Sequence, residues 1–385
     1  MGAYATRYSN MFSFLDHTAT RVTAFVLGMI LVVPWQVQGL LTQSLFLFFA
    51  SLLLTFALMP LLIAFAKHID ALDYPDARRV HAIPTPRIGG LAVILAVNIT
   101  LFFNFDYSLA FKGVVISALI VGLISLWDDI KELSAKTKLL GQFVAIAVLI
   151  YCDVVIQFAP NIWWGDWLEY ALTAFWIIGI TNAFNFLDGI NGLAASLAAA
   201  TCFLMGMLAW HTGQAYMLFL CLALAGGAAG FLPDNARYNS QARSFLGDVG
   251  STYLGWVMAA VAVMGDWSGE STIKAYAAPL LIFSVMIFDM IYTTISRIAR
   301  GDVHSFREWI EYVGKDHLHH RLMDLGCTQA QSVIIIVGFS TLMGLAALAL
   351  VKSPIMSVWL LLGQALVFYA LLSFFMLRVR KENKP

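Results

Sequence analysis

Apolar residues form long continuous runs along this chain, and short polar segments separate the runs. Most runs hold roughly 20 residues, enough for an α-helix to cross about 30 Å of hydrocarbon. Continuous runs favour helices, because a membrane-spanning barrel would alternate apolar and polar positions. The pattern predicts about eleven spans, at residues 44–66, 88–104, 108–127, 138–158, 169–185, 192–212, 214–232, 251–265, 274–295, 331–351 and 355–377.

The apolar run at residues 22–33 is shorter than the others and is followed by "PWQVQG". A helix of this length falls short of the hydrocarbon thickness, so we favour an interfacial segment over a further span. The chain then divides into an N-terminal segment at 1–43, a transmembrane domain at 44–377 and a basic tail at 378–385.

Composition supports the membrane class. Hydrophobic residues make up 60% of the 385 residues and charged residues only 12%, whereas a soluble domain carries about 25% charged residues. The expected fold is therefore an all-α, polytopic integral membrane protein. The four cysteines lack paired spacing, so neither a disulfide framework nor a zinc site is expected.

The distribution of charge predicts the orientation. The net charge is zero, which gives no indication of nucleic-acid binding. Most of the 23 Lys and Arg residues fall on alternate polar segments, and the other side holds only Arg7, Arg21, Lys112, Lys274 and Lys352. Cytoplasmic loops keep the excess of Lys and Arg. The basic side is therefore predicted to face the cytoplasm, and every polar motif described below falls on it.

The first motif is "LWDDIKE", where an apolar run ends at Asp128 and Asp129. Aspartates can simply mark a helix end in water, but two adjacent carboxylates repel each other and are better explained by a nearby cation. Mg²⁺ characteristically takes one or two carboxylates together with substrate phosphates. Lys138 follows within "KELSAKTK" and can meet phosphate or lipid headgroups.

The second motif is "TNAFNFLDGINGLAA", in which Asn182, Asn185 and Asp188 recur at three-residue spacing. Such a stripe falls on one face of a helix end. Polar residues at this depth are costly and face a cavity or the bundle interior. Hydrogen bonding between helices is one explanation. A site for a nucleotide base, ribose or metal fits the carboxamides and carboxylate better.

The third motif, "SFLGDVGSTYLG", places Asp248 between two glycines at the start of another apolar run. Gly-rich turns before a helix present backbone N–H groups to anions. Asp248 can cap the helix, or it can serve as a magnesium ligand where phosphate lies nearby.

The fourth motif, "KDHLHHRLMDLG", brings His317, His319, His320 and Arg321 together. A zinc site and a solvated charged loop are alternatives, but these side chains suit a pyrophosphate whose charge grows in a transition state. In "RRVHAIPTPRIGG", His81 and Arg87 can bind an anion, although a rigid connector explains this segment nearly as well.

Taken in order, "HAIPTPRIGG", "LWDDIKELSAKTKLLGQ", "NAFNFLDGINGLA", "FLGDVGSTYLG" and "DHLHHRL" resemble the polyprenyl-phosphate N-acetylhexosamine-1-phosphate transferases of the glycosyltransferase 4 or MraY-like superfamily. The similarity covers about residues 44–377 and is strongest to the WecA/TagO-type branch that makes undecaprenyl-diphosphate-GlcNAc.

The resemblance implies a Mg²⁺-dependent enzyme, with Mn²⁺ as an alternative, in the bacterial inner membrane. It would transfer GlcNAc-1-phosphate from a UDP-sugar to undecaprenyl phosphate and release UMP. Asp128, Asp129, Asp188 and His319 would be catalytic, and Asp248 and Asp129 would bind the metal. The implied substrate-binding residues are Asn182, Asn185, His81, Arg87, Lys138, His317, His320 and Arg321.

Other interpretations remain open at this stage. The same chemistry can use another UDP-N-acetylhexosamine or UDP-MurNAc-pentapeptide as donor. A transporter or flippase would also carry polar residues within its spans, but it would place them near the midplane and often in inverted repeats. The sequence shows polar motifs at one face and no repeat. A homodimer is compatible with the sequence but is not indicated by it.

Overall fold

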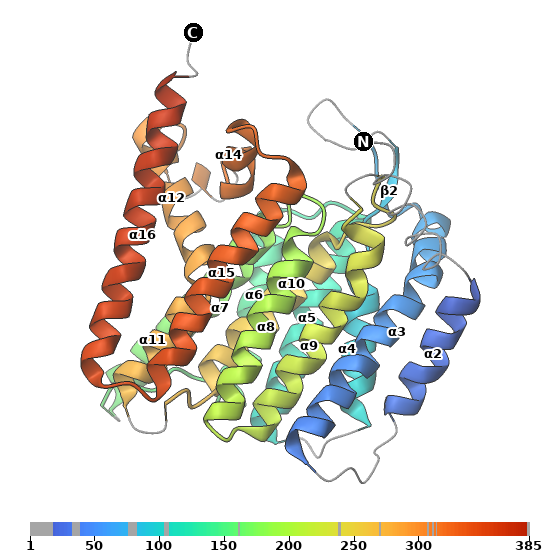
Figure 1. The fold of residues 1–385 in the computed structure, drawn as a ribbon, viewed down its shortest axis with the longest axis horizontal. Coiled ribbons are helices and arrows are strands. Elements are labelled where there is room, and N and C mark those ends of the chain that lie inside the picture. The colour runs from blue at the N-terminus through green and yellow to red at the C-terminus, as the bar shows by residue number, and fades with distance from the viewer. Residues whose placement is uncertain are drawn as a thin grey trace, which may run out of the picture.

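The computed structural model describes residues 18–382 except 33–38, 76–82, 104–107, 161, 238–239, 269–270, 306–307, 310–311 and 313. Within these residues the chain forms a helical bundle whose main helices run roughly side by side (Figure 1). The strands described are a short antiparallel pair, β1 (Leu72–Asp73) and β2 (Thr85–Pro86). The predicted all-α class is thus confirmed apart from this pair.

A helix lies at each predicted apolar run. The helices are α2 (Thr18–Val32), α3 (Leu40–His68), α4 (Gly90–Phe102), α5 (Leu109–Ile130), α6 (Ala135–Tyr151), α7 (Trp163–Phe186), α8 (Leu193–His211), α9 (Ala215–Asn235), α10 (Gly247–Met264), α11 (Thr272–Ile282), α12 (Ser284–Arg300), α14 (Leu318–Asp324), α15 (Gln329–Val351) and α16 (Ile355–Glu382). In the described part of the chain, six are long and apolar enough to cross a membrane, or seven if α11 and α12 count as one bent span. The chain is therefore a multi-pass membrane protein, and the count of eleven spans stays a prediction.

Helices α3 and α9 approach each other closely. Gly226 and Gly230, one helical turn apart on α9, face α3 so closely that a Cβ at either would overlap the backbone carbonyl of Phe48 or Leu52. Small residues at this spacing allow helix backbones to pack without side chains between them. This contact places the end of α9 near the polar loops.

The predicted single span at 274–295 is broken. The chain bends by 69° between α11 and α12, with Phe283 at the junction. Residues of both halves line a groove, described below, together with residues of α7.

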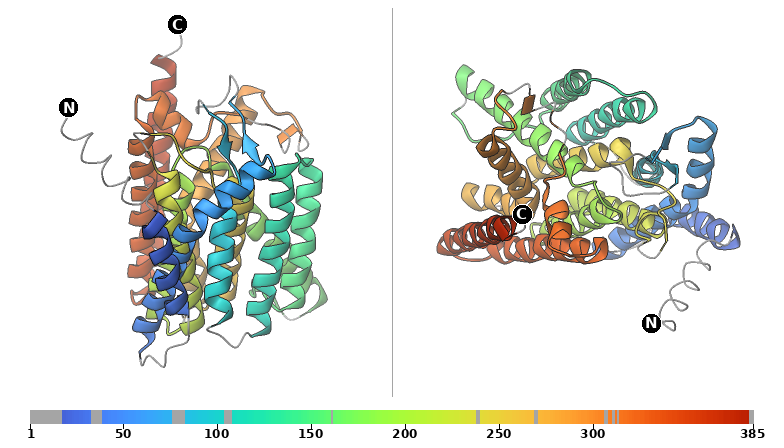
Figure 2. Two further views of the ribbon diagram at one scale, coloured as in Figure 1. Left: turned by 90° about the vertical axis from the view of Figure 1, so that its right-hand side faces the viewer. Right: turned by 90° about the horizontal axis from the view of Figure 1, so that it is seen from above.

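Helix α2 runs antiparallel to α3 along one side of the bundle (Figures 1 and 2). Its 15 residues span only about 22 Å, less than the hydrocarbon thickness. The interfacial placement of residues 22–33 stays a prediction. One sequence-based placement is wrong. Arg21, assigned to the side away from the polar motifs, pairs with Asp234 at the end of α9 that leads to those motifs. Counting loop charges cannot detect a buried pair.

Exposed aromatic side chains lie at the end of the bundle that is remote from the polar loops. Five exposed side chains lie near those ends of α6, α7, α8 and α16 that are remote from the polar loops: Tyr151, Trp163, Trp167, Trp210 and Trp359. Trp and Tyr favour the membrane–water interface, where an apolar ring and a polar group are both accommodated. This girdle indicates one boundary of the membrane and leaves the polar loops at the other.

Candidate active site

Two carboxylates from different helices share one cation. Asp128 lies in the last turn of α5 and Asp248 in the first turn of α10. The Lys138 ammonium of α6 lies 2.8 Å from Asp128 Oδ2 and 3.1 Å from Asp248 Oδ2. The Asn185 carboxamide donates to Asp248 Oδ1 at 3.1 Å. Residues that are more than 100 positions apart in sequence thus converge, as the motifs predicted. The two carboxylates face a position that suits a positive charge.

Asp129 has a different environment from its neighbour. Its Oδ1 accepts hydrogen bonds from Arg87 Nε at 3.1 Å and from the Asp248 N–H at 3.3 Å, and its Oδ2 accepts from the Val249 N–H at 2.8 Å. A carboxylate at a helix N-terminus satisfies free N–H groups and the helix dipole. Asp129 therefore holds the first turn of α10 against α5, and its predicted roles in catalysis and metal binding stay untested.

The turn at Gly247 depends on this close packing. Its φ is +74°, and a Cβ there would overlap the Arg87 carbonyl. Glycine tolerates this conformation without steric cost. The glycine of the third motif thus brings the Arg87 segment, Asp129 and Asp248 into contact.

Asp188 lies in the loop after α7, close to the other acids. Burial raises the pKa of Asp188 well above its ordinary value, and the nearby carboxylates of Asp248 and Asp129 raise it further. Concentrating several acids in one place disfavours their charged forms unless a cation compensates. Of the three residues in the predicted stripe, Asn185 and Asp188 lie at this site. Asn182 instead donates to Gln142 of α6 at 3.1 Å and to the Ile178 carbonyl at 2.7 Å.

His319 joins the histidine loop to the Asp188 loop. The side chain is 1% exposed and packs against Gly189, where a Cβ would overlap the His319 ring. Within the described residues, neither ring nitrogen has a hydrogen-bond partner. Burial lowers the pKa of His319 well below its usual value, and His320 and His317 lower it further. His319 is therefore a neutral imidazole whose one donor and one acceptor have no partner among the described residues. Buried polar groups normally have a partner, so this side chain is suited to bind a ligand.

His317 is already committed to protein contacts. Its Nδ1 lies 2.7 Å from Asp289 Oδ2, and its Nε2 lies 3.3 Å from an Arg297 nitrogen. Arginine can only donate, so Nε2 accepts and Nδ1–H donates to the carboxylate. Asp289 also accepts from the Leu318 N–H at 2.6 Å. This geometry gives His317 an orienting role, and its predicted substrate contact stays untested.

The rest of this loop is tied to α12 by arginines. Arg297 bonds both oxygens of Asp316, at 3.0 and 2.7 Å, and Arg300 adds a bond at 2.8 Å. Burial alone would raise the pKa of Asp316, but these two guanidinium groups hold it well below its usual range. Arg321 donates to the Asp316 carbonyl at 2.6 Å, and the His320 ring lies 4.2 Å from His319.

Sequence reasoning missed several of these contacts. Asp289, Thr293 and Arg297 are buried at four-residue spacing on α12, and ionisable residues inside a predicted span signal function by default. Asp289, inside the predicted span at 274–295, is such a signal in the sequence. The predicted residue His81 lies outside the described residues.

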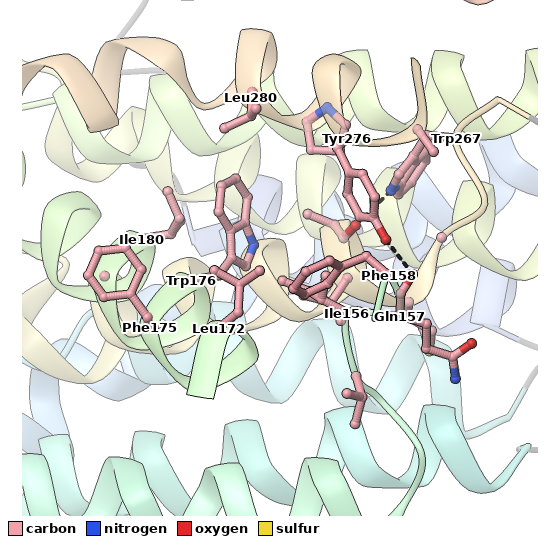
Figure 3. A pocket seen from close by; sticks show the side chains of 18 of the residues that line it. Ile156, Gln157, Phe158, Leu172, Phe175, Trp176, Ile180, Trp267, Tyr276 and Leu280 are labelled. Atoms are coloured by element: carbon pink, nitrogen blue, oxygen red, sulfur yellow. Dashed lines mark hydrogen bonds between the residues drawn. The ribbon is translucent and has the colours of Figure 1, made fainter. Parts of the chain in front are cut away.

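An apolar groove lies between α7 and the bent pair α11–α12. It encloses about 1140 Å³ and is lined by Leu172, Phe175 and Trp176 of α7 and by Tyr276 and Leu280 of α11 (Figure 3). Its lining continues to Ala183 and Met290, next in sequence to Asn182 and Asp289. The Tyr276 hydroxyl donates to the Gln157 carbonyl and the Trp176 indole to the Ala259 carbonyl, so these polar groups are satisfied. The groove suits a long apolar ligand that reaches the polar end.

The acidic side chains of the site determine which metal ion it could hold. Among the described residues, no group of three or more His, Cys, Asp or Glu side chains is arranged to hold a metal ion. Carboxylate oxygens of Asp128 and Asp248 nevertheless converge on the Lys138 ammonium, a position that a metal cation could take. Mg²⁺ takes one or two carboxylates and completes its shell with water and phosphate. The residues therefore fit Mg²⁺ held together with a phosphorylated substrate.

Comparison with known proteins identifies the family. Residues 111–266 match the model of glycosyl transferase family 4. The chain is 31% identical over 315 residues, 80% of its length and 85% of the relative, to a probable undecaprenyl-phosphate N-acetylglucosaminyl 1-phosphate transferase of Bacillus subtilis. It is 33% identical to a decaprenyl-phosphate N-acetylglucosaminephosphotransferase of Mycobacterium tuberculosis, covering 70% of this chain and 73% of the relative.

A further relative covers more of the chain. The undecaprenyl-phosphate alpha-N-acetylglucosaminyl 1-phosphate transferase of Escherichia coli K12 is 25% identical over 89% of this chain and 90% of its own length. With these relatives and the converging acids, the chain belongs to glycosyl transferase family 4, among the polyprenyl-phosphate N-acetylglucosamine-1-phosphate transferases.

Proposed function

We propose that this enzyme transfers GlcNAc-1-phosphate from UDP-GlcNAc to undecaprenyl phosphate and releases UMP. The observation that carries the proposal is the meeting of Asp128 and Asp248 around the Lys138 ammonium, with Asp188 and neutral His319 nearby. An apolar groove, whose lining reaches Ala183 and Met290, supports it. The names of the relatives supply the sugar and the class of acceptor. A transporter would not need this cluster at one end.

The reaction exchanges one phosphoanhydride for another. An oxygen of the lipid phosphate bonds to the phosphorus next to the sugar, and the bond from that phosphorus to the bridging oxygen of UMP breaks. A phosphate monoester has its second pKa near 6, so the acceptor is already nucleophilic at neutral pH and a base at Asp128 assists only modestly. The chain contributes mainly positioning and charge compensation.

Individual side chains fit these tasks. Asp128 and Asp248, with Asp129 behind them, would hold Mg²⁺ or Mn²⁺, which supplies charge neutralisation for the diphosphate when bound. Lys138 holds the same position in this structure and would be released to the phosphates. The single N–H of neutral His319 would donate to a phosphate oxygen and so satisfy a buried polar group. Asn185 keeps Asp248 oriented.

The distribution of charge and the groove support a placement in the membrane. The polar end carries the Lys-rich and Arg-rich segments, which favours the cytoplasmic side of the bacterial inner membrane. Eleven spans would be reached if the bent pair α11–α12 and the helices α4, α6, α7 and α10 also cross the membrane. The apolar groove would hold the polyprenyl tail, so the lipid can stay in the bilayer while its phosphate meets the acids.

The deciding experiment is an assay of the purified protein with undecaprenyl phosphate and a panel of UDP-sugars, measuring UMP and lipid product. We expect turnover with UDP-GlcNAc. Turnover with only another UDP-N-acetylhexosamine or with UDP-MurNAc-pentapeptide would change the assigned donor. Absence of UMP with every donor would refute the proposed chemistry.

Removal of divalent metal should suppress the reaction. Treatment with a chelator is expected to lower the rate of UMP release at least about tenfold, because the diphosphate loses its main source of charge neutralisation. Addition of Mg²⁺ or Mn²⁺ should restore the rate. An unchanged rate in excess chelator would show that Asp128 and Asp248 act without a metal.

Filling the groove should weaken the acceptor alone. A Cβ at Gly179 would meet nothing within 4 Å, so Gly179→Phe places a ring in open groove space. We expect the KM for undecaprenyl phosphate to rise about tenfold, the equivalent of one or two lost methylene burials, with the KM for UDP-GlcNAc unchanged. Gly363→Phe, also in open space but on α16, is the control. Equal acceptor KM values in both variants would place the lipid elsewhere.

A further inference from the structure

A buried charge network lies behind the active site, at the end of α9. Asp234 is fully buried, and a carboxylate at a helix C-terminus is disfavoured both by burial and by the helix dipole. Arg21 of α2 compensates it with two bonds of 2.9 Å, and Arg243 approaches to 3.3 Å. The Arg243 N–H also donates to the Asp234 carbonyl at 2.8 Å. The N-terminal helix is thus tied to the chain segment that leads to Asp248.

A proline in α3 explains why Arg21 fits this place. Pro60 lies inside α3 and has no N–H, so the carbonyl of Phe56 lacks its helical donor. Arg21 donates to that carbonyl, and its guanidinium lies 3.6 Å from the centre of the Phe56 ring. The arginine therefore satisfies an unpaired backbone oxygen and a buried carboxylate at once.

The residue after Asp234 connects two catalytic loops. Asn235 accepts a bond of 2.6 Å from the Gly192 N–H and donates one of 3.0 Å to the Ser244 carbonyl. Gly192 follows Asp188 by four residues, and Ser244 precedes Asp248 by four. A single buried carboxamide thus fixes the distance between the two loops.

Ser244 extends the connection to a third segment. Its hydroxyl donates to the Pro86 carbonyl at 3.0 Å, and the next residue, Phe245, donates its N–H to the same carbonyl at 2.8 Å. The segment of Arg87, which pairs with Asp129, is therefore held by the same set of bonds.

We propose that Asn235, locked in place by the Arg21–Asp234 pair, is a positioning residue that sets the Asp188 loop against the Asp248 loop, so that α2 is part of the catalytic scaffold. The inference rests on the proposed function, because it assigns Asn235 a task in that reaction. Asn235 acts through the acids and need not contact the substrates.

Asn235→Ala is the direct test. A displacement of about 1 Å between catalytic groups can cost on the order of 100-fold in rate, so we expect kcat to fall by about that factor. The KM for UDP-GlcNAc should change much less than kcat, with rates measured where the variant is folded. Gln214→Ala is the matched control, since Gln214 also joins two loops, with bonds of 2.6 and 2.8 Å to the backbone of Asp266, but at the opposite end of the bundle. Its kcat should stay near that of the unmodified enzyme.

Variants of Arg21 test the second half of the proposal. Arg21→Met leaves Asp234 with fewer partners, and we expect kcat to fall at least about tenfold in the protein that folds. Arg21→Lys keeps the charge but not the paired geometry and should recover part of the loss. Equal kcat in Asn235→Ala and Gln214→Ala, or no difference between the two Arg21 variants, would overturn the proposal. An inactive unmodified enzyme would instead refute the proposed function.

Discussion

Asp248→Asn should reduce UMP release by on the order of 1000-fold or more, the scale seen when a main electrostatic contact to a transition state is removed. The substitution preserves shape but removes the charge that faces Asp128 across Lys138. It leaves Lys138 with one carboxylate partner and any metal with one fewer ligand. Asp128→Asn should have an effect of similar size, because the two oxygens share one cation. UMP release and lipid product measured on the same samples give the rates.

A matched control exists within the chain. Asp166 is also an acidic residue in the first turn of a helix, α7, but at the end of the bundle away from the polar loops. Asp166→Asn should therefore retain nearly full activity with a similar change in helix-end electrostatics. Folded protein recovered from both variants would show that the loss in Asp248→Asn is chemical. Near-normal turnover in Asp248→Asn would show that the reaction does not need the cation site shared by Asp128 and Asp248.

The location of the site could be predicted from sequence because its motifs coincide with helix ends. Apolar runs define where each helix enters polar surroundings, and Asp128, Asn185 and Asp248 all fall at such ends. When alternate loops lie on one side, motifs that are distant in sequence must share a surface. No knowledge of packing is needed for that conclusion, and the structure brings these three residues together.

Individual roles could not be predicted, since they depend on partners far away in the chain. Adjacent Asp128 and Asp129 look equivalent in sequence, yet one faces a shared ammonium and the other accepts backbone N–H groups of α10. Arg21 was assigned to the wrong side because its partner, Asp234, lies 213 positions away. The role of a charged side chain depends on its tertiary contacts. Counting charges along the chain uses only the position of each residue in the sequence.

The histidine motif shows the same limit in one short segment. His317 and His319 are separated by a single residue, but the first has protein partners at both nitrogens and the second has none among the described residues. The difference arises from Asp289 and Arg297 on α12, which hold His317, and from Gly189, which leaves room for His319. Spacing within the motif gives no information about either.

His319→Ala is accordingly expected to lower kcat by about 100-fold to 1000-fold, the cost of removing a donor aimed at developing charge in a buried site. His317→Ala should instead lower the unfolding temperature as well, because it leaves the buried Asp289 carboxylate without a main partner. Rates and unfolding temperatures measured for both variants separate these outcomes. If His319→Ala loses stability but keeps its rate, the imidazole is a packing residue.

Gly189→Ala tests the same position without removing any polar atom. A methyl group there would overlap the His319 ring, so the imidazole must move while its chemistry stays intact. Since small misplacements of catalytic groups are costly, we expect a loss of kcat approaching that of His319→Ala. Gly338→Ala, which meets nothing within 4 Å on α15, should leave kcat unchanged. A normal rate in Gly189→Ala would mean that the reaction tolerates a displaced His319, and positioning could then not be the reason for its burial.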